Sequence, residues 1–283
     1  MRIFAISDLH TDFRENWAFI HRNLRETYQR DTLIVAGDIA DNLEIIGNTL
    51  ELLRAKFGRV CYVPGNHELW TRGPSEDALQ KLDDVRRLCR RLDIHMQPLK
   101  AGGCWIIPLF SWYDLDSIAA AIAEHPELEG WADFYWCRWP ESVGRSVAAF
   151  FLQMNEPHIK AYDLPVITFS HFVPRRDLLP DPTFLRFKGL YKVAICHELD
   201  NQIRRLGAKT HVFGHTHIFC DRVIDGVRYV QNPLRYPREL QTSAFPFKMI
   251  WEPQHDPSPG WEPSASQALE ESAGLPSPTP DEG

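Results

Sequence analysis

The sequence predicts an α/β fold, in which short buried strands alternate with amphipathic helices. The first observation behind this prediction is a set of short apolar segments, rich in Ile, Val and Phe, whose length suits strands better than helices. The second is the segments between them, which repeat apolar residues every three or four positions, as the buried face of a helix does. This alternation is typical of βαβ units and indicates a largely parallel sheet at the amino-terminal end.

Five segments are predicted to be buried strands. They are IFAIS from Ile3, TLIVAG from Thr32, VCYVPG from Val60, VITFS from Val166 and THVFG from Thr210.

Three amphipathic helices are predicted in the first third of the chain. We expect Ser75 to cap the third helix, and Asp41, three residues before Glu44, fits a capping arrangement for the second. Asp41 could instead orient a metal ligand. The apolar stripes are Phe13, Trp17, Ile20, Leu24 and Tyr28, then Ile46, Leu50 and Leu53, and then Leu79, Leu82, Val85, Leu88 and Leu92.

The segment from about Trp105 to Tyr162 is less regular and is interpreted as a helical insertion at the sheet edge. Its tryptophans are expected to pack mainly against one another, although they could line a substrate pocket. They are Trp105, Trp112, Trp131, Trp136 and Trp139.

The carboxyl-terminal part predicts a hairpin followed by a tail. IFCDRVI and VRYVQ are joined through Asp225 and Gly226, a pair that suits a type I′ turn, so a second sheet with antiparallel strands is expected. From Pro253 onward the chain is rich in Pro, Ser, Glu and Gly and has few apolar residues to bury. We therefore expect one domain over residues 1–252, with the insertion at about 105–162, and a disordered tail over 253–283.

Composition and charge limit the kinds of binding partner that the sequence predicts. The chain has 283 residues and a formal net charge of −7, which argues against the clustered cations that a nucleic-acid partner needs and favours a small phosphorylated substrate. The segment MRIFAISDLH resembles neither a signal peptide nor a membrane anchor, so a cytoplasmic protein without a membrane partner is expected. The six cysteines lack the close pairs of a zinc knuckle and are expected to be reduced and buried. The oligomeric state stays open.

Each predicted strand is followed by residues that make good metal ligands. In open α/β sheets, ligands bind beyond the carboxyl ends of the strands, so these residues should converge although they lie far apart in the sequence. A single Asp or His at such a place is often only structural, but five groups in the same position predict a metal site. The groups are Asp8 and His10, then Asp38, then Asn66 and His67, then His171, then His215 and His217.

These motifs resemble those of the calcineurin-like metallophosphoesterases. The resemblance is carried by DLH from Asp8, GDIAD from Gly37, GNHE from Gly65, SHF from Ser170 and GHTH from Gly214, in the family's order. It implies a four-layer α/β/β/α sandwich with two central mixed β-sheets. It also implies metal-dependent hydrolysis of a phosphate monoester or diester.

The resemblance further implies a centre of two divalent metal ions. One ion would be held by Asp8, His10, Asp38 and His217, the other by Asp38, Asn66, His171 and His215, and Asp38 would bridge both. Nitrogen and oxygen ligands suit Mn, Fe, Zn or Ni, without ranking them. Two divalent ions beside two carboxylates leave a positive charge that favours an anionic phosphoester.

The resemblance makes His67 the catalytic residue, which donates a proton to the leaving group, although it could also only support the ligand Asn66. Glu68 could equally be solvated, and Arg72, Arg175 and Arg176 could bind phosphate or lie on the surface.

The substrate is less determined than the chemistry. Pro64 precedes Gly65, and GDIADN lacks the arginine found in Ser/Thr protein phosphatases, so a phosphoprotein substrate is not expected. Class III cyclic-nucleotide phosphodiesterases share the motif order and are the alternative. A non-catalytic metal-binding scaffold is an alternative of a different class, against which the presence of His67 argues.

Overall fold

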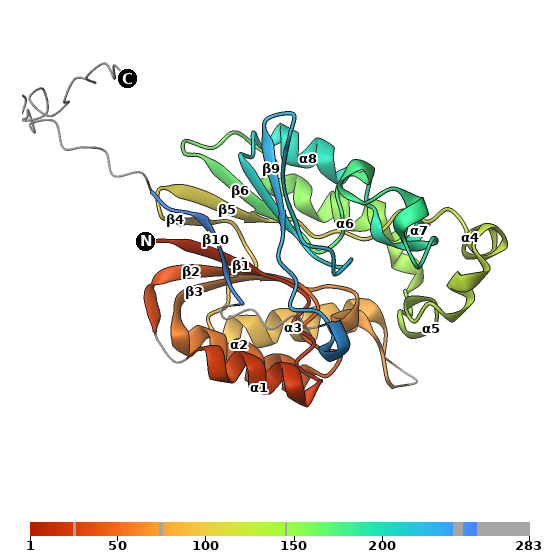
Figure 1. Ribbon diagram of the computed structural model, residues 1–283, viewed down its shortest axis with the longest axis horizontal. Helices are drawn as coiled ribbons and strands as arrows, with labels where there is room; N and C mark the ends of the chain where they lie inside the picture. The colour runs from red at the N-terminus through yellow and green to blue at the C-terminus, as the bar shows by residue number, and fades with distance from the viewer. Residues whose placement is uncertain (25–26, 74–75, 145, 240–245, 254–283) are drawn as a thin grey trace, which may run out of the picture. The chain divides into compact units, whose positions relative to one another are not determined.

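Two β-sheets lie face to face between two outer layers of helices (Figure 1). The structure, a computed structural model, describes residues 1–24, 27–73, 76–144, 146–239 and 246–253. Residues Met1–Glu252 form one compact unit. The predicted four-layer α/β/β/α sandwich with two mixed sheets is confirmed. Of the predicted tail, residues 254–283 lie outside the described residues.

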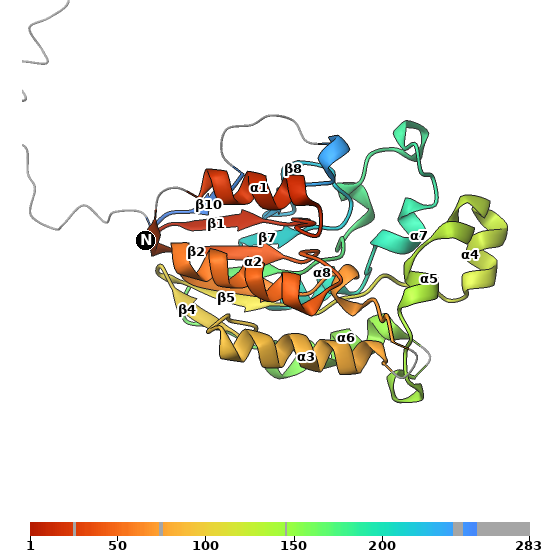
Figure 2. The same ribbon diagram turned by 90° about the horizontal axis from the view of Figure 1, so that it is seen from below.

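The first sheet contains the amino-terminal strands in the order β10-β1-β2-β3. Strands β1 (Ile3–Ile6), β2 (Tyr28–Ala36) and β3 (Phe57–Val63) are parallel, and β10 (Lys248–Trp251) pairs with β1 in the antiparallel direction. Helices α1 (Arg14–Asn23), α2 (Leu43–Lys56) and α3 (Ala78–Arg91) cover its outer face (Figure 2). The predicted βαβ connections are therefore present.

Three local predictions in this half need correction. Tyr28 begins β2 and does not belong to the first helix. The residue that caps α2 is Asn42, whose side chain accepts hydrogen bonds from the backbone amides of Glu44 and Ile45, so Asp41 is not the cap. Helix α3 is capped by Asp77, which accepts from the amide of Gln80, whereas Ser75 lies outside the described residues.

The second sheet has the order β4-β5-β6-β7-β9-β8. Its inner strands β5 (Cys104–Pro108), β6 (Val166–Phe169), β7 (Thr210–Phe213) and β9 (Val227–Gln231) are parallel, and the edge strands β4 (Leu99–Ala101) and β8 (Cys220–Ile224) are antiparallel to their neighbours. Helices α6 (Val147–Asn155) and α8 (Leu199–Arg205) lie on its outer face (Figure 1). The β8–β9 hairpin is confirmed, and Asp225 and Gly226 at its turn have φ of 48° and 81°, as a type I′ turn requires.

The insertion begins later than predicted, because Trp105 belongs to β5. Helices α4 (Ile118–Glu124) and α5 (Asp133–Trp136) lie together with α7 (Leu190–Ala194) beyond the carboxyl ends of β1 to β3 (Figure 2). Trp112 packs as expected, with its ring 4.9 Å from Trp139 and 5.0 Å from Phe172. Short 3₁₀ helices occupy His67–Leu69, Pro126–Gly130, Glu141–Val143, Glu156–His158, Arg176–Leu178, Pro182–Phe184 and Pro237–Glu239.

The apolar core between the sheets comes from one face of each. Alternate residues of a strand point to opposite faces, so Ile3 and Ala5 face the second sheet while Phe4 and Ile6 face the helices. Within the described part of the chain, no helix is long and apolar enough to cross a membrane. The inner core also contains Ile34, Ala36, Cys61, Val63, Ile106, Ile167, Phe169, Val212 and Val230.

Candidate metal centre

The predicted site residues come together where the strands end. Residues from both sheets contribute, since His215, after β7, donates its backbone N–H to Asp8 Oδ1, after β1, at 2.8 Å. His171, after β6, lies 3.4 Å through Nε2 from Oδ2 of Asp38, after β2. All of the predicted residues are buried except His217, which is half-buried.

The backbone at these positions is unusual. Residues other than glycine rarely adopt positive φ, because Cβ then crowds the backbone. Among the described residues, eight such cases occur, and five of them are predicted site residues. Backbone strain of this kind gathers at functional sites and persists only where the surrounding structure holds it. The five are Asp8 at 53°, His10 at 43°, Asp38 at 58°, His215 at 76° and His217 at 57°.

One cluster that could hold a metal ion consists of Asp8, His10 and His217. His217 Nδ1 donates to Glu239 Oε2 at 2.9 Å, so its Nε2 presents a lone pair to the cluster. That atom lies 3.0 Å from His10 Nε2 and 3.7 Å from Asp8 Oδ1. No hydrogen-bond partner on Nδ1 fixes the His10 tautomer, so its Nε2 either donates to His217 or presents a second lone pair that a cation between the rings could bind.

A second cluster consists of Asp38, His171 and His215, with Asn66 beside them. His171 Nδ1 donates to Ala36 O and His215 Nε2 donates to Val193 O, both at 2.9 Å, which turns their other ring nitrogens toward the cluster. These nitrogens lie 3.1 and 3.0 Å from Asn66 Oδ1 and 3.2 Å from each other. Three acceptor atoms therefore converge, and they fit a divalent cation.

The pKa shifts of the residues in the second cluster also favour a bound cation. Burial opposes a charge on His171, yet the neighbouring carboxylate of Asp38 raises the pKa of this histidine to about 9. Burial alone would raise the pKa of Asp38, but His171 and His67 hold it well below its usual range. The Asp38 carboxylate therefore favours a positive charge at this cluster, which a divalent metal ion would supply.

His67 lies at the border between the clusters and an open cleft. It forms a third group with His10 and Asp38, and its ring stacks on Trp70 with the centroids 3.8 Å apart. Its Nε2 lies 3.9 Å from Asp38 Oδ2 and 3.4 Å from the Tyr236 hydroxyl. The cleft has a volume of about 510 Å³ and is lined by Asp12, Phe13, Glu15, Asp41, His67, Trp70, Arg72, Tyr236, Pro237 and Arg238.

The other residues singled out in the sequence, Glu68 and three arginines, have different surroundings. Glu68 is not solvated, because it is fully buried and accepts backbone hydrogen bonds from Asp38, Ile39 and Gly65. Arg72 lines the cleft and pairs with Asp41. Arg175 pairs with Asp177, Asp200 and Asp225, and Arg176 stacks over Tyr191, so neither lines this cleft.

Sequence patterns did not assign several residues to the site, although Trp131 was among the tryptophans that could line a substrate pocket. Asp133 in the insertion binds Asn66, and Trp131 lies beside His215 with ring centroids 5.9 Å apart. Tyr236 stacks on His10 at 4.3 Å, and Glu239 fixes His217. None of these residues follows a predicted strand directly, so the pattern that found the others contained no signal for them.

Comparisons with known proteins agree with this geometry. The sequence model of the calcineurin-like phosphoesterase family matches residues 1–219. The [acyl-carrier-protein] phosphodiesterase PptH of Mycobacterium tuberculosis is 29% identical over 287 residues, which cover 92% of this chain and 86% of that protein.

A solved structure shares the fold. The crystal structure of phosphopantetheinyl hydrolase (PptH) from Mycobacterium tuberculosis matches with a TM-score of 0.72 and 24% identity, over 93% of this chain and 98% of that one. The likeness in structure supports the fold, and the family match covers most of the chain. The chain therefore belongs to the calcineurin-like phosphoesterases and is a metal-dependent phosphoesterase, a hydrolase that acts on ester bonds.

Proposed function

We propose that this enzyme is a dinuclear-metal phosphodiesterase that removes the phosphopantetheinyl group from an acyl carrier protein by hydrolysis. The observation that carries the proposal is the pair of acceptor clusters beside a cleft that opens at His67. The substrate comes from the relative PptH, a phosphodiesterase acting on acyl carrier protein. A phosphopantetheinyl arm is joined to its carrier by a phosphodiester, which is the bond class that such a centre hydrolyses.

The two clusters support the ligand sets that the family resemblance implies for two ions. Asp8, His10, Asp38 and His217 would hold the first, and Asp38, Asn66, His171 and His215 the second, with Asp38 shared. Two bound divalent ions would neutralise charge on the phosphoryl oxygens and lower the pKa of a nearby water. The donor set of imidazoles, carboxylates and one amide suits Mn, Fe, Zn or Ni.

His67 would complete the reaction as the proton donor. Water forms a new bond to phosphorus and loses a proton to the solvent, while the bond from phosphorus to the carrier oxygen breaks and that oxygen takes a proton from His67. The Trp70 ring stacks on the His67 ring and holds it in place. The Tyr236 hydroxyl lies 3.4 Å from His67 Nε2, and both residues line the cleft.

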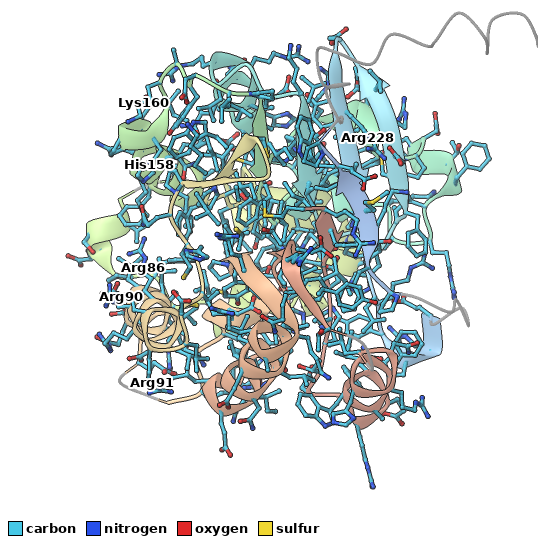
Figure 3. The ribbon with its side chains drawn as sticks, turned by 90° about the vertical axis from the view of Figure 1, so that its left-hand side faces the viewer. Arg86, Arg90, Arg91, His158, Lys160 and Arg228 are labelled. Carbon is cyan, nitrogen blue, oxygen red and sulfur yellow. The ribbon has the colours of Figure 1, made fainter. Side chains whose placement is uncertain are left out.

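The residues that line the cleft support the proposal that the substrate carries an extended phosphopantetheinyl arm. Its aromatic walls, Phe13, Trp70 and Tyr236, suit the uncharged pantetheine chain, and Arg238 adds a cation to the lining, whereas Arg72 is paired with Asp41. Other cations lie elsewhere. Figure 3, which looks onto the amino ends of β1 to β3, shows Arg86, Arg90, Arg91, His158 and Lys160 at one side of the molecule, and none of them lines the cleft.

The test is hydrolysis of a phosphopantetheinyl carrier protein by Mn²⁺-loaded enzyme, followed by mass spectrometry of the carrier. We expect loss of the arm, and we expect His67→Ala to lower the rate about 10²- to 10⁴-fold while two ions stay bound. His158→Ala is the matched control, because His158 does not line the cleft and its loss should leave the rate unchanged. Hydrolysis of cyclic nucleotides but not of the carrier would favour the class III alternative, and no hydrolysis of any phosphodiester would overturn the proposal.

A further inference from the structure

Asp133 brings the insertion into the metal centre. It is the first residue of α5, in a part of the chain with no ligand motif, yet it is only 3% exposed. Its carboxylate reaches Asn66, which lies 67 residues earlier in the chain at the end of β3. The insertion therefore does more than cover the edge of the sheets.

The contacts of Asp133 use both of its oxygens. Oδ1 accepts from Asn66 Nδ2 at 2.9 Å and from the Trp70 indole N–H at 2.7 Å. Oδ2 accepts from the Trp131 indole N–H at 3.0 Å. All three partners donate, and a carboxylate is the side chain that accepts several such bonds without presenting a donor of its own.

The bond to Asn66 decides which end of its amide faces the second cluster. The two ends of an asparagine amide have nearly the same shape, but only the NH₂ end can donate. Because Asp133 holds that end, Oδ1 points toward His171 Nε2 and His215 Nδ1. A rotated amide would instead aim N–H groups at the position of a cation, where they cannot coordinate it.

The hydrogen bond to Trp70 affects His67, the proposed proton donor. Trp70 is fixed through its indole N–H, and its ring stacks on His67 with an interplanar angle of 29°. One buried carboxylate thus restrains both the amide beside the second cluster and the ring beneath the proton donor.

We propose that Asp133 is a positioning residue that locks the Asn66 amide with its oxygen toward the second metal and, through Trp70, fixes the plane of His67. This inference rests on the proposed role of Asn66 as a ligand. It predicts that the insertion must fold before the centre can hold its second ion. Removal of an outer partner of a metal ligand lowers affinity about 10- to 100-fold.

The test is a double-mutant cycle read as metal content rather than activity. Asp133→Ala, Asn66→Asp and the double variant are equilibrated with graded Mn²⁺, and the bound ions are counted by mass spectrometry of the metal. We expect Asp133→Ala to weaken the second ion about 10- to 100-fold. We expect the double variant to regain it, because a carboxylate presents an oxygen in either rotation and needs no partner to orient it.

Two further variants keep the test decisive. Asp116→Ala removes an exposed carboxylate of the same insertion and should leave both ions bound. If Asp133→Ala does not fold, Asp133→Leu fills a similar space and accepts no hydrogen bond, so the same loss is expected.

Three outcomes decide between the claims. Both ions bound by Asp133→Ala with the parental affinity would overturn the inference, as would a double variant no better than Asp133→Ala, because a purely structural defect would persist. A parent that never holds two ions would overturn the dinuclear centre together with this inference. Two ions in the parent without hydrolysis of the carrier would overturn only the substrate, and the metal counts would still decide the role of Asp133.

Discussion

At the scale of single residues, Glu68 joins the ends of two strands. Its carboxylate accepts from the amides of Asp38 and Ile39, after β2, at 3.1 and 2.5 Å, and from Gly65, after β3, at 2.6 Å. The side chain is fully buried, so water does not compete for these bonds. Glu68 thereby holds the backbone that presents Asp38 and Asn66 to the clusters.

Replacing Glu68 by Gln should destabilise the protein. A glutamine has one acceptor oxygen, and its NH₂ would face a backbone N–H, so at least one buried donor loses its partner at a cost of about 1–3 kcal/mol. Urea unfolding followed by circular dichroism measures the change. Glu51→Gln, on the exposed side of α2, is the control, and an unchanged midpoint for Glu68→Gln would contradict this role.

Residues that follow a buried strand could be predicted, whereas partners brought in by tertiary contacts could not. Asp38 and His171 stand after apolar segments, and the convergence of strand ends made their meeting foreseeable. Asp133 stands in an irregular segment, and its contacts to Asn66 and Trp70 span more than 60 residues. Asp41 and Asn42 both suit an N-cap, and only the backbone geometry separates them.

At the scale of elements, the turn after β2 requires a glycine, a residue without a side chain. Gly37 has a φ of 82°, which disfavours any residue with a Cβ. A Cβ there would overlap with His171 Nδ1 and lie 2.8 Å from the amide nitrogen of Gly65. The close approach of β6 to the end of β2, and with it the position of His171, requires glycine.

Gly37→Ala should therefore displace His171 and weaken metal binding. Strain at the positive φ and the overlap with His171 both act against the folded state, so the melting temperature should also fall. Metal content and thermal unfolding check the two effects. Gly130→Ala is the control, since a Cβ there meets nothing within 4 Å, and parental metal content in Gly37→Ala would refute the requirement.

The sequence identified strands that form continuous apolar segments or flank a clear turn, but it did not identify β5 and β10. β1 to β3 and the β8–β9 hairpin follow from apolar segments and an Asp-Gly turn. β5 was assigned to the insertion, because Trp105 resembled the tryptophans after it. β10 (Lys248–Trp251) is as short as β1, β6 and β7, but only one of its four residues is buried, so it lacks the continuous buried segment that identified them; it pairs with the edge of β1.

At the scale of the whole molecule, an ion cluster joins the two sheets. Asp221, on β8, accepts from Arg228, on β9, at 2.8 and 2.9 Å, and lies 3.0 Å from Lys248, on β10. Figure 3 shows Arg228 beside β10. Arg228 and then Lys248 lower the pKa of Asp221 to about 2, against the partial burial that opposes the charge.

This pKa predicts how the cluster responds to acid. A lowered folded-state pKa means that the stabilisation is complete above the unfolded value of about 3.9 and is lost as the pH falls through about 2. Asp221→Asn should thus melt below the parent at pH 7, and the gap should close between pH 4 and 2. Thermal unfolding across this range measures the gap, which salt should also reduce because the groups are partly exposed. A gap independent of pH would exclude the ion cluster as its cause.

The pairing of β10 with β1 has a consequence for biosynthesis. β1 is translated first, but its outer neighbour follows every other described strand, so a growing chain carries an open strand edge until translation reaches Lys248. Open edges recruit strands of other chains and lead to aggregation. A truncation that removes Lys248–Trp251 would leave all of the proposed metal ligands in place and still yield a chain prone to aggregate, which sets the shortest form worth expressing.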